Sequence, residues 1–357
     1  MFEQDKDFKL FEGSGYPVQQ NRVYETKYEA INCLKGDVVI IQNHKTGLIY
    51  NSSFDTELMV YDESYDNEQS HSKAFQCHLE EVLTLVKQYL GTKNLIEVGC
   101  GKGYFLEKLL ASGVSVLGFD PTYAGDNDKI VKSYFSPDLI SSNTEGLILR
   151  HVLEHIPDPV SFLENLKHAN GGKGKIYIEV PCFDWIVKNR MWFDIFYEHV
   201  NYFRLRDFNN IFSKVHASGT FFGGQYIYII ADLQDLRVPV AQIDDRLSAV
   251  SQEFFQGINS LGPKYIWGAS SKGVIYALNK VRAGQQIDYA IDVNPAKQGK
   301  FMPVTGIEIV SPSNAMHFLE DGAEICVLNP NYLKEIDGMT KNKFRLTTFD
   351  NEKAVDA

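Results

Sequence analysis

Basic residues, closely spaced cysteines and long apolar runs are all scarce in this sequence, and each shortage excludes a class of protein. Lys and Arg number 35 against 46 Asp and Glu, so the formal net charge is −11. No basic cluster is present, and we expect no nucleic-acid partner because nucleic-acid affinity depends mostly on cationic contacts. No apolar run approaches the roughly 18–20 residues that a membrane helix needs, so we expect no membrane partner.

The cysteines are also too dispersed to form a cluster. The five are Cys33, Cys77, Cys100, Cys182 and Cys326, and none belongs to a Cys-x-x-Cys pair. This spacing supports neither a disulfide framework nor a zinc cluster, so we expect no bound metal. The N-terminus, Met-Phe-Glu-Gln-Asp-Lys-Asp, lacks the basic and apolar regions of a signal peptide, which predicts a cytoplasmic protein.

Residues 94–120 carry the most informative pattern: an apolar run, a glycine-rich turn, an amphipathic stretch and a second apolar run that ends in a carboxylate. The residues concerned are Glu97, Gly99, Gly101, Gly103 and Tyr104 in the turn, then Asp120 and Pro121. Glycines let a turn pass tightly beneath a ligand at a helix N-terminus, and Asp120 can accept hydrogen bonds from a ribose diol. The pattern predicts a nucleoside-binding crevice.

The order Glu-Val-Gly-Cys-Gly-Lys-Gly, with Asp120 seventeen residues after Gly103, resembles motifs I and II of the class I S-adenosylmethionine-dependent methyltransferases. The resemblance implies S-adenosylmethionine as the cofactor. It places the turn beneath the methionine part, Glu97 close to that part, and Asp120 on the ribose. A glycine-rich turn without any ligand is the alternative.

A chain of 357 residues exceeds the usual size of a single core, so several domains are expected. We predict an N-terminal β module at residues 1–75, which includes a strand pair at Asp37–Gln42 and Leu48–Tyr50. Helical spacing begins at Ser72, and the methyltransferase domain is assigned to residues 76–240. A polar, helix-like segment at about 242–259 leads into a C-terminal α/β domain at residues 241–357.

Strands and helices alternate through the two larger domains. The segments are Gly146–Leu149, Val160–His168, Lys175–Val180, Phe208–His216 and Thr220–Ala231, and later Lys264–Trp267, Ile287–Asp292, Glu308–Ile309 and Glu324–Leu328. This alternation of strands and helices predicts an α/β fold with a doubly wound, mostly parallel, Rossmann-like sheet and a second, smaller α/β domain. Ser271-Lys272-Gly273 opens a helix there, so this domain is either purely structural or contacts a phosphate of the substrate.

Residues 150–159 include His-x-x-Glu-His, which matches a zinc-protease motif. Zinc is not expected here, because the run directly follows a strand and is stopped by Pro157 and Pro159. In class I methyltransferases, Leu-Glu-His-Ile-x-Asp-Pro is a familiar run after the fourth strand. By that resemblance the cofactor wall contains Arg150, His151, Glu154 and His155.

Aromatic and titratable groups gather in Trp192–Phe203, just after a predicted strand end. Such a density is typical of an acceptor pocket, with His199 as the candidate general base beside Glu198. If the acceptor is a carbon next to a ketone, Tyr197 or Tyr202 could donate a hydrogen bond to the enolate oxygen. The alternative is that His199 is a hydrogen-bonded core histidine among packing residues.

Further motifs together resemble the three-part sugar C-methyltransferases, which methylate deoxy-keto sugars attached to a nucleoside diphosphate. They are Glu-Val-Pro, Glu-His-x-x-Tyr-Phe, Phe222-Gly-Gly-Gln225, Trp267-Gly-Ala-Ser-Ser-Lys-Gly273, Asp292-x-Asn-Pro-x-Lys297 and Pro303-Val-Thr-Gly306. Two features depart from that family. Its N-terminal zinc cysteines are absent, with Asn43 and Thr46 where the second pair would fall, and Phe196 replaces the first His of Tyr-His-Glu-His.

The sequence therefore predicts a methyltransferase that acts on a small molecule in a biosynthetic pathway. The expected reaction is C-methylation of a nucleotide-linked deoxy-keto sugar, with His199 as the base. The alternative is an O- or N-methyltransferase for a sugar or another small metabolite. A protein methyltransferase and a non-catalytic scaffold are further alternatives, and the sequence indicates no oligomeric state.

Overall fold

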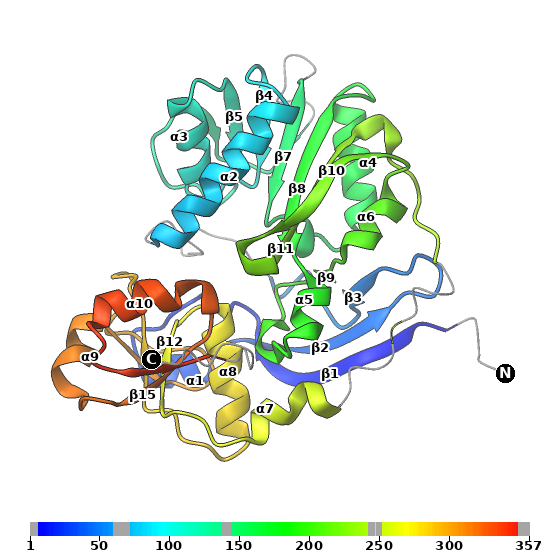
Figure 1. Cartoon of the computed structure of the whole chain (residues 1–357). Helices are drawn as coiled ribbons and strands as arrows, with labels where there is room; N and C mark the ends of the chain where they lie inside the picture. The colour runs from blue at the N-terminus through cyan, green and yellow to red at the C-terminus, as the bar shows by residue number, and fades with distance from the viewer. Residues whose placement is uncertain (1–5, 60–71, 137–143, 242–246, 248–251, 349–357) are drawn as a thin grey trace.

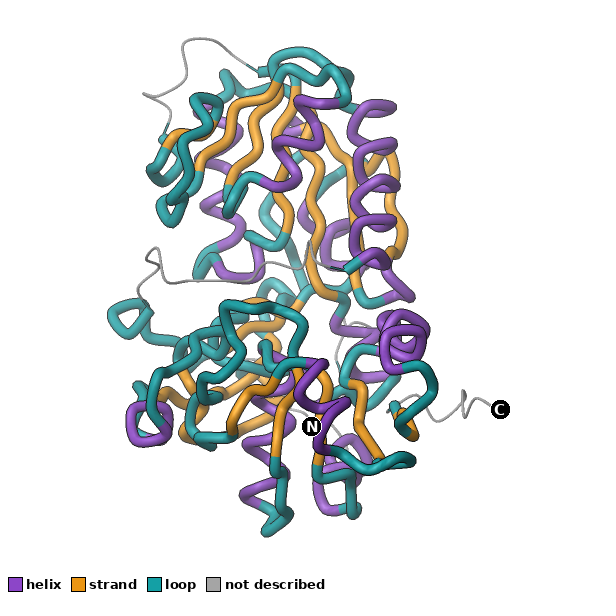
Figure 2. Tube along the Cα trace, turned by 90° about the vertical axis from the view of Figure 1, so that its left-hand side faces the viewer, coloured by secondary structure: helices purple, strands orange, loops and turns teal. Residues whose placement is uncertain are grey.

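The computed structural model describes residues 6–59, 72–136, 144–241, 247 and 252–348, and contains three β-sheets. Figure 1 shows a seven-stranded sheet with its helices in the upper part of the molecule, and the other two sheets below it. The side view in Figure 2 shows the same division into an upper and a lower part. No helix within these described ranges is both long and apolar enough to span a membrane.

The seven-stranded sheet has the order β10-β11-β8-β7-β4-β5-β6. Its strands are β4 (Leu95–Val98), β5 (Val116–Phe119), β6 (Ile130–Val131), β7 (Gly146–Arg150), β8 (Lys175–Pro181), β10 (Val215–Phe221) and β11 (Tyr226–Asp232). The five strands from β8 to β6 are parallel, whereas β10 and β11 form an antiparallel hairpin at the β8 edge. The predicted doubly wound α/β fold is confirmed.

Helices cover both faces of this sheet (Figure 1). They are α2 (Lys73–Tyr89), α3 (Tyr104–Ala111), α4 (Pro159–Ala169) and α6 (Leu205–Ile211). Strand β7 shows why: Leu147 and Leu149 join the apolar core beneath α4 and α6, and Ile148 joins the core beneath α2 and α3. Because successive strand residues point to opposite faces, a continuous apolar strand must be covered on both sides.

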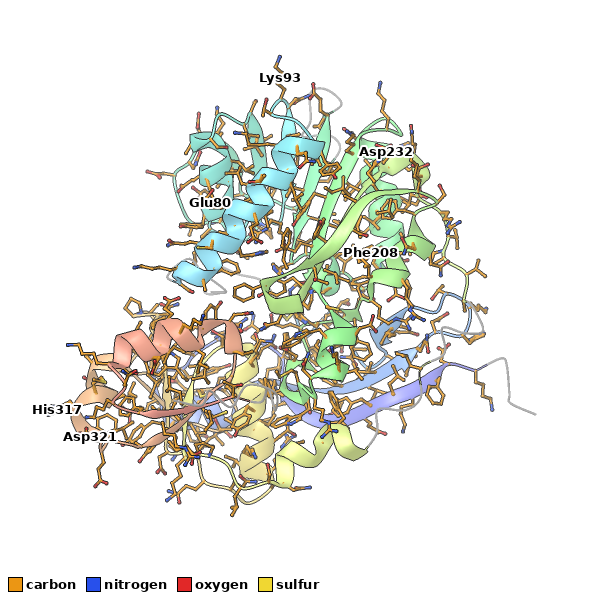
Figure 3. The ribbon with its side chains drawn as sticks, in the orientation of Figure 1. Glu80, Lys93, Phe208, Asp232, His317 and Asp321 are labelled. Atoms are coloured by element: carbon orange, nitrogen blue, oxygen red, sulfur yellow. The ribbon has the colours of Figure 1, made fainter. Side chains whose placement is uncertain are left out.

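Sheet direction decides where a ligand can bind. In Figure 3, Lys93, which precedes β4, lies at the end of the sheet farthest from the C-terminal domain, whose outer edge carries His317 and Asp321. The parallel strands therefore run toward the lower part of the molecule. Their carboxyl ends, where open α/β sheets bind ligands, face the C-terminal domain.

The N-terminal residues form a four-stranded antiparallel sheet together with a strand from much later in the chain. Its order is β1-β2-β3-β9, with β1 (Phe8–Pro17), β2 (Lys35–Gln42), β3 (Ile49–Asn51) and β9 (Asn201–Tyr202), and α1 (Lys27–Ile31) connects β1 to β2. The pairing of β2 with β3 confirms the expected strand pair. Strand β9 fixes the aromatic segment 192–203 against this sheet.

The C-terminal residues form a second, smaller parallel sheet of order β14-β13-β12-β15-β16. Its strands are β12 (Tyr265–Trp267), β13 (Tyr289–Ile291), β14 (Glu308–Val310), β15 (Glu324–Val327) and β16 (Arg345–Thr347). Its helices are α7 (Gln256–Asn259), α8 (Ser271–Arg282), α9 (Pro312–Phe318) and α10 (Leu333–Thr340). A Cβ added at Gly273, in the first turn of α8, would lie 1.9 Å from the Gly268 carbonyl oxygen, so only glycine fits there.

Polar contacts join the C-terminal domain to the seven-stranded domain. The Glu335 carboxylate in α10 accepts a hydrogen bond of 2.8 Å from the hydroxyl of Ser72, which is the N-cap of α2. The Gln225 amide donates to Asn329 at 2.7 Å, and the Asn331 amide donates to the Phe222 carbonyl at 2.7 Å. These contacts hold the two domains together around the carboxyl edge of the sheet.

Two sequence predictions need qualification. Residues 208–216, predicted as one element, contain the end of α6 and the start of β10. The polar segment predicted near 242–259 lies partly outside the described residues, and its described end contains a short 3-10 helix (Gln252–Phe255) and α7.

Candidate functional site

Two adjoining cavities lie along the carboxyl edge of the seven-stranded sheet. The first, of about 320 Å³, is lined by the glycine-rich turn, Asp120 and the end of β7, and we call it the cofactor cavity. The second, of about 230 Å³, lies between this edge and the C-terminal domain, and we call it the acceptor cavity. His151 and His155 line both cavities, so a group held in one can reach a group held in the other at these residues.

The glycine-rich turn forms one wall of the cofactor cavity and leads into α3. Gly99 has a φ of 72°, and a Cβ there would lie 2.4 Å from a Val152 methyl group. Gly103 is the N-cap of α3 with a φ of 84°, and a Cβ there would lie 2.4 Å from Ile130. Both positions therefore need glycine for conformation as well as for space.

Asp120 fixes the turn and faces the same cavity. One of its carboxylate oxygens accepts a hydrogen bond of 2.7 Å from the Gly101 amide, and the other accepts from the Thr122 amide at 2.8 Å and from its hydroxyl at 2.6 Å. A carboxylate offers about four acceptor positions, so the ribose diol can still donate to it.

Glu97 supplies the clearest evidence of how this cavity would hold a ligand. Its side chain is buried, and its Oε2 atom has no hydrogen-bond partner within the part of the chain that the structure describes. Burial raises the pKa of Glu97 to about 8, even though the nearby Arg150 charge opposes this shift. A buried carboxyl without a donor suits the cationic methionine part of S-adenosylmethionine, so the residues present fit this cofactor.

Most of the residues predicted for the cofactor do line the cofactor cavity: Glu97, Gly99, Gly101, Tyr104, Asp120, Pro121, Arg150, His151 and His155. Gly103 lies in the turn and packs against Ile130 without lining the cavity, and Glu154 lines the acceptor cavity instead. The sequence analysis missed an apolar wall formed by Phe75, Leu79, Phe135 and Phe162. Phe75 and Leu79 belong to the stretch of helical spacing that begins at Ser72. That spacing predicts the packed face of a helix, but it does not show that the face also borders a cavity.

A buried charged network underlies the junction of the two cavities. Glu179 lies 3.0 Å from Nε2 of His78, 3.1 Å from Nε2 of His151 and 3.4 Å from the Arg150 guanidinium. His151, which has a positive φ of 53°, also lies 3.3 Å from Glu154 through Nδ1. Burial opposes the charged imidazole, but Glu154 and Glu179 outweigh it and raise the pKa of His151 to about 9. His151 is therefore a cation at neutral pH.

His199 lies at the same junction, on the acceptor side. Its ring packs 3.9 Å from the ring of Phe196 and 5.1 Å from the ring of His155, measured between centroids. Burial, together with the nearby His155 ring and the positive charges of His151 and Lys272, holds the pKa of His199 well below its usual range. The ring therefore stays neutral at pH 7 and keeps a lone pair that can accept a proton.

The other three predicted catalytic residues do not line either cavity. The Tyr197 hydroxyl contacts the backbone of Asp55, accepting from its amide at 2.9 Å, and the Tyr202 hydroxyl contacts the backbone of Phe196 at 3.1 Å. The Glu198 carboxylate accepts a hydrogen bond from the Gln20 amide at 3.0 Å. Both tyrosine hydroxyls thus contact backbone groups away from the two cavities, and the expectation that one of them donates to an enolate stays a prediction.

The far side of the acceptor cavity is formed by the start of α8 and the loop after β13. Lys297 is buried and donates to the Ser270 hydroxyl at 2.6 Å, and Lys272 forms an ion pair with Asp194. These lysines and Ser271, in the first turn of α8, line the cavity, and the Ser271 amide and hydroxyl both donate to Asn21. The turn that was predicted to open a helix at Ser271 thus borders the acceptor cavity.

Comparison with known proteins agrees with this arrangement. A family model described as a methyltransferase domain matches residues 72–216, and one described as a C-methyltransferase C-terminal domain matches residues 243–346. The C-methyltransferase NovU of Streptomyces niveus is 25% identical over 306 residues, covering 72% of each chain.

Similar solved structures match only part of the chain. An S-adenosylmethionine-dependent methyltransferase from Archaeoglobus fulgidus is 18% identical, covering 45% of this chain and all of that one, with a TM-score of 0.33. The magnesium protoporphyrin IX methyltransferase of Synechocystis PCC 6803 is 13% identical, covering 44% and 79%, with a TM-score of 0.32. With the two matched domains and the cavity described above, the chain is an S-adenosylmethionine-dependent methyltransferase.

Proposed function

We propose that this enzyme methylates a carbon atom of a keto sugar attached to a nucleoside diphosphate, in a biosynthetic pathway, with His199 as the general base. The observation that carries the proposal is the position of His199. It is a neutral imidazole in the acceptor cavity, beside the two histidines that border both cavities. A base placed there can remove a proton from the atom that receives the methyl group.

The reaction needs little else from the protein. The bound cofactor supplies a methyl group on a positively charged sulfur. His199 would take the proton from the carbon next to the ketone, and the electron pair left on that carbon would form the new bond to the methyl group. The bond between the methyl group and the sulfur breaks in the same step, and its electron pair stays on the sulfur, which becomes neutral. The protein must hold the two reacting atoms roughly 3–3.5 Å apart and in line.

Two observations support a nucleotide-linked sugar as the acceptor. Lys297 and Lys272 line the same acceptor cavity as His199, and their positive charges suit a diphosphate. The relative with 25% identity is named a C-methyltransferase, which supports carbon as the methylated atom.

O- or N-methylation of a sugar or another small metabolite is the second candidate. It is favoured by the position of Tyr197 and Tyr202, whose hydroxyls contact backbone groups outside the acceptor cavity. With their hydroxyls held there, neither would donate to an enolate oxygen, whereas a hydroxyl acceptor needs only the base.

Transfer of radiolabelled methyl groups from S-adenosylmethionine to a panel of nucleoside-diphosphate sugars tests the proposal. We expect label in a keto sugar, on carbon, with loss of deuterium from an acceptor deuterated at that position. Label on oxygen or nitrogen, with the deuterium retained, would support the second candidate. Transfer only to acceptors without a nucleotide would contradict the proposal.

A further inference from the structure

Glu154 is a buried carboxylate at the point where the methyl group must be transferred. It lies in a short 3-10 helix (Leu153–His155) directly after β7, and its side chain is 1% exposed. It lines the acceptor cavity rather than the cofactor cavity. Its position therefore points to a contact with the acceptor.

The two oxygens of Glu154 differ in their nearest charged neighbour. Oε1 lies 3.3 Å from Nδ1 of His151, which is within ion-pair distance. Both oxygens are buried, and neither accepts a hydrogen bond from the residues that the structure describes. A buried carboxylate oxygen without a donor is unfavourable, so a ligand that supplies one gains affinity there.

The acceptor group that donates a hydrogen bond to Glu154 must lie close to the reacting atom of the acceptor. Glu154, His155 and His199 each contribute one polar atom to a cluster, and these three atoms all lie within 4.8 Å of one another. A small molecule that presents an acidic proton to His199 can therefore present a donor on the same atom to Glu154. This spacing restricts the position of the donor on the acceptor.

The surrounding charge favours a neutral donor over a cation. Two histidines and a carboxylate are a set that can hold a metal ion. However, the imidazolium of His151 already balances the charge of Glu154, and the positive charge of Lys272, which is paired with Asp194, also acts on His199. A divalent cation would meet this repulsion, whereas a hydroxyl group would not.

We propose that Glu154 binds the acceptor, with Oε2 accepting a hydrogen bond from a hydroxyl group on the methylated atom. The inference rests on the proposed function, because it takes His199 as the group that faces the reacting atom. It adds the substrate class: for a keto sugar, the acceptor is an α-hydroxy ketone.

Crystals of the protein with S-adenosylhomocysteine provide a test that does not require the natural acceptor. They would be soaked separately in ethylene glycol and in manganese chloride. We expect a glycol hydroxyl within hydrogen-bond distance of Glu154 Oε2, and none there in Glu154→Ala. Manganese bound by Glu154, His155 and His199 would overturn the proposal, as would a protein donor on Oε2.

Kinetics test the same contact in turnover. A nucleoside-diphosphate keto sugar with a hydroxyl next to the ketone would be compared with the analogue that lacks this hydroxyl. We expect the wild-type enzyme to prefer the hydroxylated compound by roughly 10–100-fold in kcat/KM, and Glu154→Ala to discriminate less than threefold. An undiminished preference in Glu154→Ala would overturn the proposal.

Two controls separate the possible failures. Glu154→Gln keeps the side-chain shape and one acceptor oxygen, so it should fold normally, bind S-adenosylmethionine as the wild type does, and show an intermediate preference. Glu145→Gln removes an exposed carboxylate at the opposite end of β7 and should change nothing. If no nucleotide sugar is methylated, the proposed function fails, while the crystal soaks still decide the role of Glu154.

Discussion

His199 and His151 lie at the junction of the two cavities, and they differ in charge because their neighbours differ. His151 lies between two carboxylates and is cationic, whereas His199 faces Phe196 and positive groups and is neutral. The same residue type thus supplies a fixed charge and a free lone pair. Environments that separate the pKa values of neighbouring groups are typical of catalytic sites.

The raised pKa of His151 predicts how stability depends on pH. A histidine whose folded pKa lies above its unfolded value of about 6.5 stabilises the fold fully below pH 6.5. This contribution is lost as the pH rises through about 9. The free energy of unfolding should therefore decline between these values in denaturant titrations, and His151→Gln should flatten the decline. An equal decline in the variant would show that other groups cause it.

Asp120 offers a test of the cofactor cavity. Replacing Asp120 by Ala would remove the proposed ribose contacts, each of which contributes about 1.5–3 kcal/mol when charge-assisted, and would also release the Gly101 amide. Binding of S-adenosylmethionine, measured by calorimetry, should weaken at least roughly tenfold. Asp128→Ala, in the exposed loop that follows, should bind normally. Unchanged affinity in Asp120→Ala would mean that the ribose lies elsewhere.

Residue types and spacing predicted a glycine-rich turn that lines a cavity, but they did not reveal the backbone contacts of the two tyrosines. Glycines and a terminal Asp have roles set by local backbone geometry, which the sequence displays directly. The role of Tyr197 depends instead on Asp55 and Gly36, because a Cβ at Gly36 would lie 2.2 Å from the Tyr197 ring. Contacts between segments so far apart in the chain leave no local signal.

Among the elements, α8 depends most visibly on a single residue. In Gly273→Ala the new Cβ would meet the Gly268 carbonyl, which is backbone and cannot move aside cheaply. We expect a loss of about 1–3 kcal/mol in the free energy of unfolding, the usual cost of overpacking. Gly338→Ala is the matched control, since a Cβ in α10 meets nothing within 4 Å and should be neutral or slightly stabilising. Equal stability of the two variants would contradict this close approach.

The alternation of elements was predictable, but the sheet edge was not. Apolar strands and amphipathic helices such as α2 carry their own periodicity, so most of the parallel sheet followed from the sequence. Strands β10 and β11 are neighbours in the chain and pair antiparallel, and β11 then pairs with β8. An apolar run indicates a strand without indicating its direction or its partner.

At the scale of the whole molecule, the acceptor cavity exists only because the C-terminal domain is attached to the carboxyl edge of the main sheet. Its lining comes from both domains, and the N-terminal sheet takes β9 from the segment that carries His199. Sequence patterns predicted the separate domains. They could not predict a cavity between them, because its walls are assembled from surfaces far apart in the chain.

Glu335 tests the coupling between the domains. Glu335→Ala removes the acceptor for Ser72 at the N-terminus of α2, a capping contact of the kind that contributes about 0.5–2 kcal/mol. We expect the C-terminal domain to unfold at lower temperature in scanning calorimetry and the acceptor KM to rise. Glu324→Ala, an exposed carboxylate in the same domain, should change neither. Unaltered unfolding and KM in Glu335→Ala would show that the contact is dispensable.

The most direct test of the account is release of deuterium from a nucleotide keto sugar that is labelled next to its ketone, measured during methyl transfer by the wild type and by His199→Asn. We predict that the wild type releases one deuterium for each methyl group transferred. His199→Asn should transfer methyl groups roughly 10²–10⁴ times more slowly while binding S-adenosylmethionine normally, as expected for a lost base. Turnover of the variant within about threefold of the wild type, or methyl transfer with the deuterium retained, would contradict the account.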